Sequence, residues 1–326
     1  MIKLMTKNHP ISKKLQPWER FLILADLDGT LLNNKTKITP YTRKVIREIV
    51  KQGHIFVIVS GHAPKNTVHY YKQLGLKHLM CNLNGAYIWN PSNENFVPVN
   101  LCFNLETAFK ILTTEKIMQY VKNFTLENYK GTYMKYIPAP EKGLKQLTRA
   151  FRIRKNQTVT KCKDDLSNLK GIDCNSILLQ LKDNSKESLN KLIYELHHFS
   201  KKLKSHIWYD DEAGYMVEVS TKFATKGTAL AYLSNYYSIP IEQCVAFGDG
   251  DNDAEMLKHA AYSFAMSNGT VTAKLSAHYI TRFTNDQDGL AKTLDFLSRS
   301  LSKTIYAARN RIMSENEEIF RLKDGK

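Results

Sequence analysis

The sequence predicts an α/β protein in which a doubly wound parallel sheet is interrupted by an inserted α+β domain. Three observations carry this prediction. The apolar run at 21–25 leads directly into acidic residues, as in a buried strand that ends at the edge of a parallel sheet. Strand and helix patterns then alternate as far as about residue 85. They stop there and resume after about residue 221.

The first part of the core has the order β-α-β-α-β. After the opening strand, Thr39 and Pro40 predict the start of a helix that ends before Gly53. The segment HIFVIVSG, 54–61, repeats the opening pattern of a buried strand that ends at small polar residues. A second helix and a third short strand within 78–86 complete a Rossmann-like arrangement.

The composition changes from about Ala86, where Asn, Pro and Lys become more frequent and the apolar runs become short and alternating. The end of this stretch, 206–220, has the pattern of a β-hairpin. The alternation of strand and helix patterns then returns. Helices are expected at 226–237 and 253–260, and strands are expected within 244–253, 262–266 and 278–281.

These patterns divide the chain into four segments. Residues 18–85 and 222–300 are expected to form the core domain, residues 86–221 the inserted α+β domain, and residues 301–326 a C-terminal helical tail. Apolar side chains along the tail would let it pack on the core or join two copies of the chain. Both a monomer and a homodimer therefore stay open.

Composition favours a cytoplasmic protein with an anionic partner. No apolar run approaches the roughly 18 residues of a membrane span, and the first residues lack the apolar region of a signal peptide. The five cysteines include no C-x-x-C pair, so we expect reduced thiols. The formal charge of +16 favours anionic ligands. Basic clusters such as 152–155 lack interleaved aromatic residues, so we do not expect nucleic acid as the partner.

Polar residues gather where the predicted parallel strands end. Because the carboxyl ends of such strands share one edge of the sheet, residues more than two hundred positions apart are expected to meet there. Carboxylates this close repel one another unless a cation compensates them, and oxygen ligands without His or Cys favour Mg²⁺. The residues concerned are Asp26, Asp28, Ser60, Asp249, Asn252 and Asp253.

Other residues suit a phosphate ligand. Lys226 opens a predicted helix, so its ammonium and the free N–H groups of the helix start would both attract an anion. Ser60 and Gly61 would add a hydroxyl and backbone donors. In such a site one aspartate can attack phosphorus to form an aspartyl-phosphate, and a second can serve as acid and then base.

The acidic segment GDGDND, 248–253, is not a calcium-binding EF-hand loop. Its alternating acids would suit one, but Ala254 stands at the sixth position and Ala260 at the twelfth, where such a loop needs Gly and Glu. Asp251 is therefore expected to be an exposed turn residue and not a ligand.

Taken in order, these motifs resemble those of the haloacid dehalogenase superfamily, and within it the Cof-type sugar-phosphatase group with a large inserted cap domain. The matching segments are DLDGTLL, VIVSG, TKFATKGTAL and GDGDND. The resemblance covers the core, which is about half the chain, and implies a Rossmann-like core that binds Mg²⁺ and a small phosphorylated metabolite.

The resemblance also implies a role for each matched residue. Asp26 would be the nucleophile and Asp28 the general acid and base. Mg²⁺ would be bound by Asp26, the backbone carbonyl of Asp28, Asp249 and Asp253. The phosphoryl group would be held by Ser60, Gly61, Lys226 and Asn252.

One position departs from the family pattern. The second motif usually continues with Arg after Ser-Gly, and here His62 takes that place. His is shorter and only partly charged at neutral pH, which affects how a leaving group would be recognised. Asn84, in NLNGA, matches the group's pattern, and together with His62 it is expected to border the substrate.

The sequence thus favours a Mg²⁺-dependent phosphatase that hydrolyses small phosphomonoesters through an aspartyl-phosphate, with the inserted domain closing over the site and choosing the leaving group. Two alternatives stay open. A phosphotransferase or phosphomutase of the same superfamily would pass the phosphoryl group to another acceptor. A basic nucleic-acid-binding or partner-binding protein would keep the fold without the chemistry.

Overall fold

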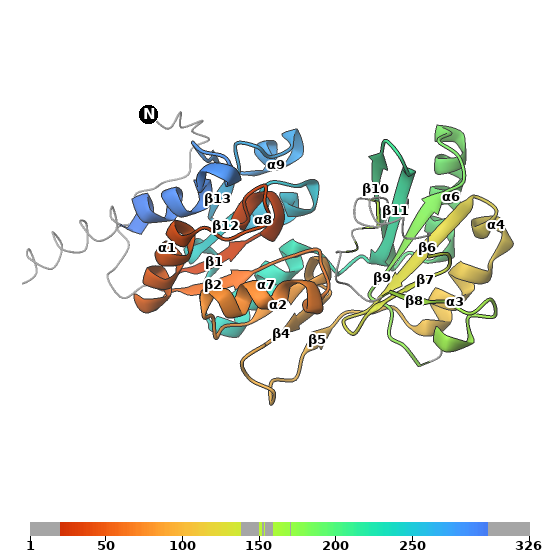
Figure 1. Ribbon diagram of the computed structural model, residues 1–326, viewed down its shortest axis with the longest axis horizontal. Helices are drawn as coiled ribbons and strands as arrows, with labels where there is room; N and C mark the ends of the chain where they lie inside the picture. Colours follow the sequence, from red (N-terminus) through yellow and green to blue (C-terminus); the bar gives the residue numbers. More distant parts are fainter. Residues whose placement is uncertain (1–19, 138–149, 152, 154–158, 170, 299–326) are drawn as a thin grey trace, which may run out of the picture. The chain divides into compact units, whose positions relative to one another are not determined.

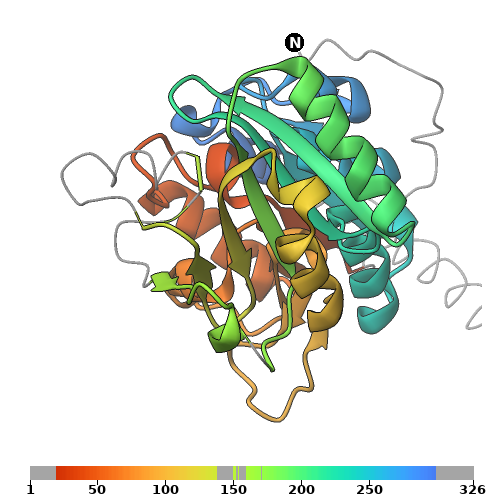
Figure 2. The ribbon, with the colours of Figure 1, turned by 90° about the vertical axis from the view of Figure 1, so that its right-hand side faces the viewer.

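The computed structural model describes residues 20–298 apart from 138–149, 152, 154–158 and 170 (Figures 1 and 2). The predicted helical tail, 301–326, lies outside the described residues. Contacts divide the described chain into two units. The first takes in the residues up to Val57 and those from Leu233 onward, and the second is Ile58–Tyr232.

The first unit contains a five-stranded sheet with the strand order β14-β13-β12-β1-β2. The pairs β1/β12, β12/β13 and β13/β14 are parallel. The strands β1, β2 and β12 are buried along their whole length, as their unbroken apolar runs predict. The bounds are β1 Leu22–Ala25, β2 Ile55–Ile58, β12 Cys244–Gly248, β13 Tyr262–Ala265 and β14 Tyr279–Ile280.

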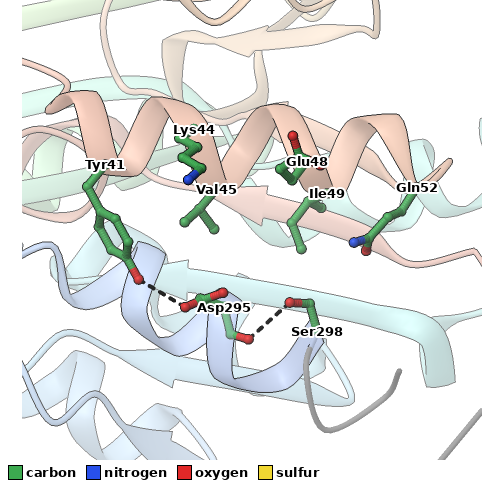
Figure 3. Close-up of a pocket in the computed structure, with 8 residues that line it drawn as sticks. All are labelled: Tyr41, Lys44, Val45, Glu48, Ile49, Gln52, Asp295 and Ser298. Carbon is green, nitrogen blue, oxygen red and sulfur yellow. Dashed lines mark hydrogen bonds between the residues drawn. The ribbon is translucent and has the colours of Figure 1, made fainter. Parts of the chain in front are cut away.

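Helices of the first unit include α1 (Pro40–Lys51), α8 (Ala254–His259), α9 (Val271–Ser276) and a helix at 289–298. The predicted start of α1 is confirmed, because the Thr39 side chain accepts a hydrogen bond from the backbone N–H of Thr42 and Pro40 follows Thr39. Figure 3 shows α1 lying along the helix at 289–298, where the Tyr41 hydroxyl donates to Asp295 at 3.2 Å.

The second unit begins with α2 (Pro64–Leu74) and a three-stranded antiparallel sheet of β3 (Met80–Asn82), β4 (Tyr87–Trp89) and β5 (Val99–Asn100). Just beyond β2, Val59 forms a parallel bridge with Cys81 of β3. Helix α7, Lys226–Tyr237, begins in this unit and has the bounds that the sequence predicts.

The larger sheet of the second unit has the order β10-β11-β9-β6-β7-β8, and all of its pairs except β7/β8 are antiparallel. One face packs on helices α3, α4 and α6 through a buried apolar cluster that includes Leu126, Ile177 and Val219 (Figure 1). The bounds are β6 Val121–Glu127, β7 Thr132–Met134, β8 Val159–Lys161, β9 Ser176–Leu181, β10 Leu203–Asp210, β11 Gly214–Thr221, α3 Leu105–Thr113, α4 Glu115–Met118 and α6 Lys186–Phe199.

The predicted fold class is confirmed: a parallel α/β sheet is accompanied by an α+β part that lies between its two halves in the sequence. The hairpin at β10 and β11 is also confirmed. The domain boundaries at 86 and 221 stay predictions. All five cysteines are free thiols, and four of them are buried. Among the described helices, none is both long and apolar enough to cross a membrane.

Candidate active site

The turn after β1 carries the first pair of acids. Asp26 is 7% exposed, and the chain then coils so that the N–H of Leu31 donates to the Asp26 carbonyl at 3.2 Å. Gly29 within the coil has a φ of 77°, which favours glycine. A Cβ at Gly29 would lie 2.2 Å from Oδ2 of Asp249, so the turn also needs glycine to let that carboxylate approach.

The loop after β12 is held by one of its own carboxylates. Asp253 is fully buried, and its Oδ2 accepts hydrogen bonds from the N–H groups of Asp249 and Gly250, both at 2.9 Å. The Thr30 hydroxyl donates to Asp249 Oδ1 at 2.8 Å. Asp249 is therefore oriented from two sides, by its own loop and by the turn after β1.

These two loops bring three carboxylates together. One oxygen each from Asp26, Asp249 and Asp253 lies within 4.8 Å of the others. The strands β1 and β12 pair with Ala25 opposite Phe247, so the acids follow neighbouring strand ends. Three carboxylates at this spacing fit a divalent cation with oxygen ligands, because their mutual repulsion needs a positive charge to offset it. The side chain of Asp28 is not part of this group.

The remaining polar residues of this loop have different positions. Asp251 is exposed, as predicted; it begins a short 3-10 helix, Asp251–Asp253, and accepts a hydrogen bond from the Thr270 hydroxyl at 2.7 Å. Asn252 is half-buried, and a Cβ at Gly250 would lie 2.6 Å from its Oδ1. Gly250 thus leaves room for the Asn252 amide to fold back along the loop.

In the second unit, Ser60 lies in the turn that follows β2. It is 1% exposed, its N–H donates to the Cys81 carbonyl at 3.0 Å, and its hydroxyl accepts from the N–H of His62 at 3.1 Å. The Ser60 carbonyl accepts from the N–H of Asn84 at 3.1 Å. The turn of the second motif is therefore tied to the residues after β3.

The turn after β3 also meets the start of helix α7. Asn84 adopts a left-handed conformation with φ 53°, and its Oδ1 lies 3.0 Å from the position of a Cβ at Gly61. Gly85 has a φ of 100°, and a Cβ there would lie 2.2 Å from the carbonyl oxygen of Thr225. Glycine is required at this contact, which brings the turn against the residue that precedes α7.

Lys226, the first residue of α7, is fully buried. Burial raises the pKa of the nearby Cys81 thiol to about 12, and the positive charge of Lys226 opposes part of that rise. A buried ammonium is costly unless acceptors or anions surround it, so its position suits a site that takes a negatively charged ligand.

One buried residue beside these turns, Asn82, was not predicted from the sequence. The Asn82 amide is fully buried, donates to the His62 carbonyl at 2.9 Å and to Thr67 Oγ1 at 2.8 Å, and accepts from Trp89 Nε1 at 2.9 Å. A lone Asn at the end of a short strand gives no sequence signal for these contacts, because their partners lie 7 to 20 residues away.

The predicted site residues thus form two groups. In the first unit, Asp26, Asp249 and Asp253 form the carboxylate cluster, with Asp28 and Asn252 in the same loops. In the second unit, one network of turns holds Ser60, Gly61, His62, Asn84 and the start of α7.

Comparisons with known proteins match most of the chain. The sequence model of a family described as haloacid dehalogenase-like hydrolase matches residues 23–294. A similar protein of Bacillus subtilis (strain 168), the 5-amino-6-(5-phospho-D-ribitylamino)uracil phosphatase YitU, is 28% identical over 275 residues, covering 84% of this chain and 96% of that protein. Phosphatase YwpJ of the same organism is 27% identical over 302 residues, covering 85% and 99% of the two chains.

Among solved structures, a haloacid dehalogenase-like hydrolase from Bacteroides thetaiotaomicron has the same fold. The TM-score is 0.69 at 23% identity, with 86% of this chain and all of that chain covered. The family match spans most of the chain and both loops of the carboxylate cluster. The chain therefore belongs to the haloacid dehalogenase-like hydrolases.

Proposed function

We propose that this phosphatase hydrolyses phosphomonoesters of small metabolites with the help of Mg²⁺, through an aspartyl-phosphate on Asp26. The observation that supports this most is the cluster of Asp26, Asp249 and Asp253 at neighbouring parallel strand ends. The relatives named as phosphatases support the reaction class. The name of YitU, which specifies a phosphoribitylamino compound, supports a small phosphorylated metabolite as substrate.

The carboxylate cluster and the backbone carbonyl of Asp28 would hold Mg²⁺. When bound, the ion offsets the negative charge of the phosphoryl oxygens and of the carboxylates themselves. The left-handed turn at Gly29 supports this assignment, since it gives the Asp249 carboxylate a space that any Cβ would fill. One carboxylate oxygen of Asp253 accepts hydrogen bonds from two backbone N–H groups. These bonds fix the direction of its second carboxylate oxygen.

The chemistry is a pair of displacements at phosphorus. In the first, a carboxylate oxygen of Asp26 forms a bond to phosphorus while the ester P–O bond breaks, and the carboxylic acid of Asp28 gives its proton to the leaving oxygen. In the second, the Asp28 carboxylate takes a proton from water. The water oxygen then bonds to phosphorus, which releases inorganic phosphate and restores Asp26.

The residues of the second unit would bind the substrate. Lys226, Ser60 and the N–H of Gly61, together with Asn252, are proposed to hold the phosphoryl oxygens. The complete burial of Lys226 at the start of a helix supports this role, because both its charge and the helix start favour an anion. His62 and Asn84 are proposed to border the leaving group.

The test is phosphate release from a panel of phosphorylated metabolites, with Mg²⁺ or with excess chelator, for the parent protein and for Asp26→Asn. We expect metal-dependent release by the parent and a loss of kcat of about a thousandfold or more in the variant. Asp251→Asn is the matched control, because this exposed acid lies in the same loop as Asp249 but outside the cluster. It should keep nearly the parental rate.

Two results would contradict the proposal. A near-parental rate in Asp26→Asn would show that Asp26 is not the nucleophile. Consumption of an ester only when an acceptor alcohol is added, without release of phosphate, would indicate a phosphotransferase.

A further inference from the structure

A small apolar cluster in the second unit contains residues that adjoin the turns with the predicted phosphate-binding residues. Three of its buried members each lie within two positions of a predicted site residue, namely His62, Asn84 or Lys226. All three are at most 5% exposed. They are Ala63, Leu83 and Ala224. A side chain that packs in this cluster therefore contacts the surroundings of all three site residues.

Backbone hydrogen bonds join the cluster to the turns. The N–H of Leu83 donates to the His62 carbonyl at 3.2 Å. The N–H of Leu101, a partly buried member of the cluster, donates to the carbonyl of Ala86 at 2.7 Å, and Ala86 follows Asn84 and Gly85. A shift of the apolar side chains would therefore also shift the backbone of the turns.

One aromatic ring joins this cluster from the six-stranded sheet. Tyr129 lies in the turn between β6 and β7, and its ring stacks on that of Tyr87 in β4, with the ring centroids 4.6 Å apart and the ring planes at 5°. Tyr87 is buried and Tyr129 is partly buried. Stacked aromatic rings stabilise each other beyond the effect of the area that they bury, so the stack fixes the β6–β7 turn to β4.

A fully buried amide sets the position of Tyr129. The Oδ1 of Asn175 accepts a hydrogen bond from the N–H of Tyr129 at 3.2 Å. The Nδ2 of Asn175 donates to Asn100 Oδ1 at 2.7 Å and to the Leu101 carbonyl at 3.1 Å. This one side chain thus connects the β6–β7 turn to the end of β5. A buried amide with these partners has one orientation, so Tyr129 is held where its ring meets Tyr87.

Another tyrosine of the same hairpin packs elsewhere. Tyr133 of β7 is also partly buried, but it packs against the apolar cluster under helices α3, α4 and α6. The two tyrosines therefore stabilise the hairpin through different neighbours, and Tyr129 is the one whose neighbours adjoin the predicted phosphate-binding residues.

We propose that Tyr129 is a positioning residue for phosphate binding. Its stack on Tyr87 holds the apolar cluster together, and the cluster in turn holds the turns after β2 and β3 and the start of α7. Tyr129 itself is not proposed to touch the phosphate. The inference rests on the proposed phosphatase function and adds a residue on which the affinity for the phosphoryl group depends.

The test measures the Kd of inorganic phosphate by isothermal titration calorimetry in the presence of Mg²⁺, together with the hydrolysis of p-nitrophenyl phosphate. Tyr129→Ala removes the ring, and Tyr129→Phe keeps the ring without the hydroxyl. Tyr133→Ala is the matched control, because it removes the same kind of side chain from the same hairpin but from the other cluster.

We expect Tyr129→Ala to raise the Kd of phosphate about tenfold and to lower kcat/KM for p-nitrophenyl phosphate by a similar factor. Tyr129→Phe should keep both values within about twofold of the parent, because the stack is retained. Tyr133→Ala should lower the melting temperature but leave both values parental, since a loss of stability alone does not change the affinity of the molecules that stay folded. If Tyr129→Ala does not fold, Tyr129→Leu replaces it with the same expectation, because leucine fills apolar space without a flat ring.

The outcomes separate the positioning role from the proposed function. If the parent binds phosphate but hydrolyses no ester, the proposed function is wrong, and the Kd values still decide the role of Tyr129. If the parent binds no phosphate, both proposals are wrong. A parental Kd in Tyr129→Ala, or equal changes in Tyr129→Ala and Tyr133→Ala, would show that Tyr129 contributes only to stability. A Kd in Tyr129→Phe as high as in Tyr129→Ala would assign the effect to the hydroxyl and contradict the stacking.

Discussion

At the scale of single residues, the carboxylate cluster depends on how closely two loops approach each other. Gly29 and Asp249 are 220 positions apart, yet a Cβ on the first would overlap the carboxylate of the second. Thr30 adds a hydrogen bond to the same carboxylate. The Gly-Thr pair after Asp28 is therefore part of the geometry of the cluster and not only a turn signal.

Replacing Gly29 by Ala should lower the activity that depends on the carboxylate cluster more than it lowers the stability of the fold. The added methyl group pushes Asp249 away, so we expect kcat/KM to fall about a hundredfold and half-maximal activity to need more Mg²⁺. Gly53→Ala is the control: Gly53 also has a positive φ, 97°, but nothing lies within 4 Å of its Cβ position. It should cost about 1 kcal/mol of stability with activity unchanged. Equal activity losses in the two variants would refute the steric account.

The sequence predicted the residues of this cluster but not their supports. Asp26 and Asp249 could be predicted because each directly follows an apolar strand and parallel strand ends share an edge. Thr30 and the two N–H groups that bind Asp253 act through contacts that depend on the folded loops. No periodicity in the chain encodes such contacts, so they appear only in the structure.

At the scale of elements, the turn after β2 forms hydrogen bonds with the end of strand β3 and with the residue that follows it. The carbonyl of His62 accepts from the Asn82 amide and from the N–H of Leu83, while the N–H of Ser60 donates to Cys81. Strand β3 is thus a support for the second motif. This is a structural reason for a polar amide at a buried strand end.

Replacing Asn82 by Leu should loosen the turn that carries Ser60 and His62. The change leaves the Nε1–H of the partly buried Trp89 without its acceptor, and we expect a loss of about 2 kcal/mol in unfolding free energy together with a roughly tenfold fall in kcat/KM. Thr67→Val removes another of the Asn82 contacts without touching His62. It should lower stability by about 1 kcal/mol and leave kcat/KM as it was. If kcat/KM in Asn82→Leu were also parental, Asn82 would have only a structural role.

At the scale of the whole molecule, the strands β1, β2 and β12 and helix α7 were predicted at the right places in the chain, whereas neither the antiparallel pairing of β3 with β4 nor the pairing in the six-stranded sheet was predicted. Helix α7 and the strands β1, β2 and β12 have strong local signals, namely caps, unbroken apolar runs and abrupt polar ends. In the six-stranded sheet, β9 lies between β6 and β11. The alternating sequence of a short strand predicts which of its faces is apolar, but it does not predict which other strand will pair with it.

The stability of the folded chain should fall in mild acid through His54. Burial lowers the pKa of this imidazole from its ordinary value of 6.5, and its Nδ1 accepts a hydrogen bond from the N–H of Phe21 at 3.1 Å. Below that value the unfolded chain binds a proton more readily than the folded chain, so the free energy of unfolding decreases as the pH falls.

Thermal unfolding at about pH 7.5 and about pH 5.5 measures this effect. His54→Asn keeps an acceptor but does not titrate, so its melting temperature should fall less than that of the parent between the two values. His259→Asn, at an exposed position in α8, should follow the parent. If the melting temperature of His54→Asn depended on pH as strongly as that of the parent, the loss of stability in acid would come from another group.

The central claim is that Asp26 becomes phosphorylated during turnover, and chemical trapping tests it most directly. Protein that is turning over a preferred ester in the presence of Mg²⁺ is quenched with acid and treated with borohydride, which reduces an aspartyl-phosphate to homoserine. Mass spectrometry of the digest then identifies the residue. The account predicts homoserine at position 26, dependent on substrate and absent when Mg²⁺ is removed. Homoserine at another aspartate, or unmodified Asp26 while phosphate is being released and trapping is efficient in a known aspartyl-phosphate enzyme, would contradict it.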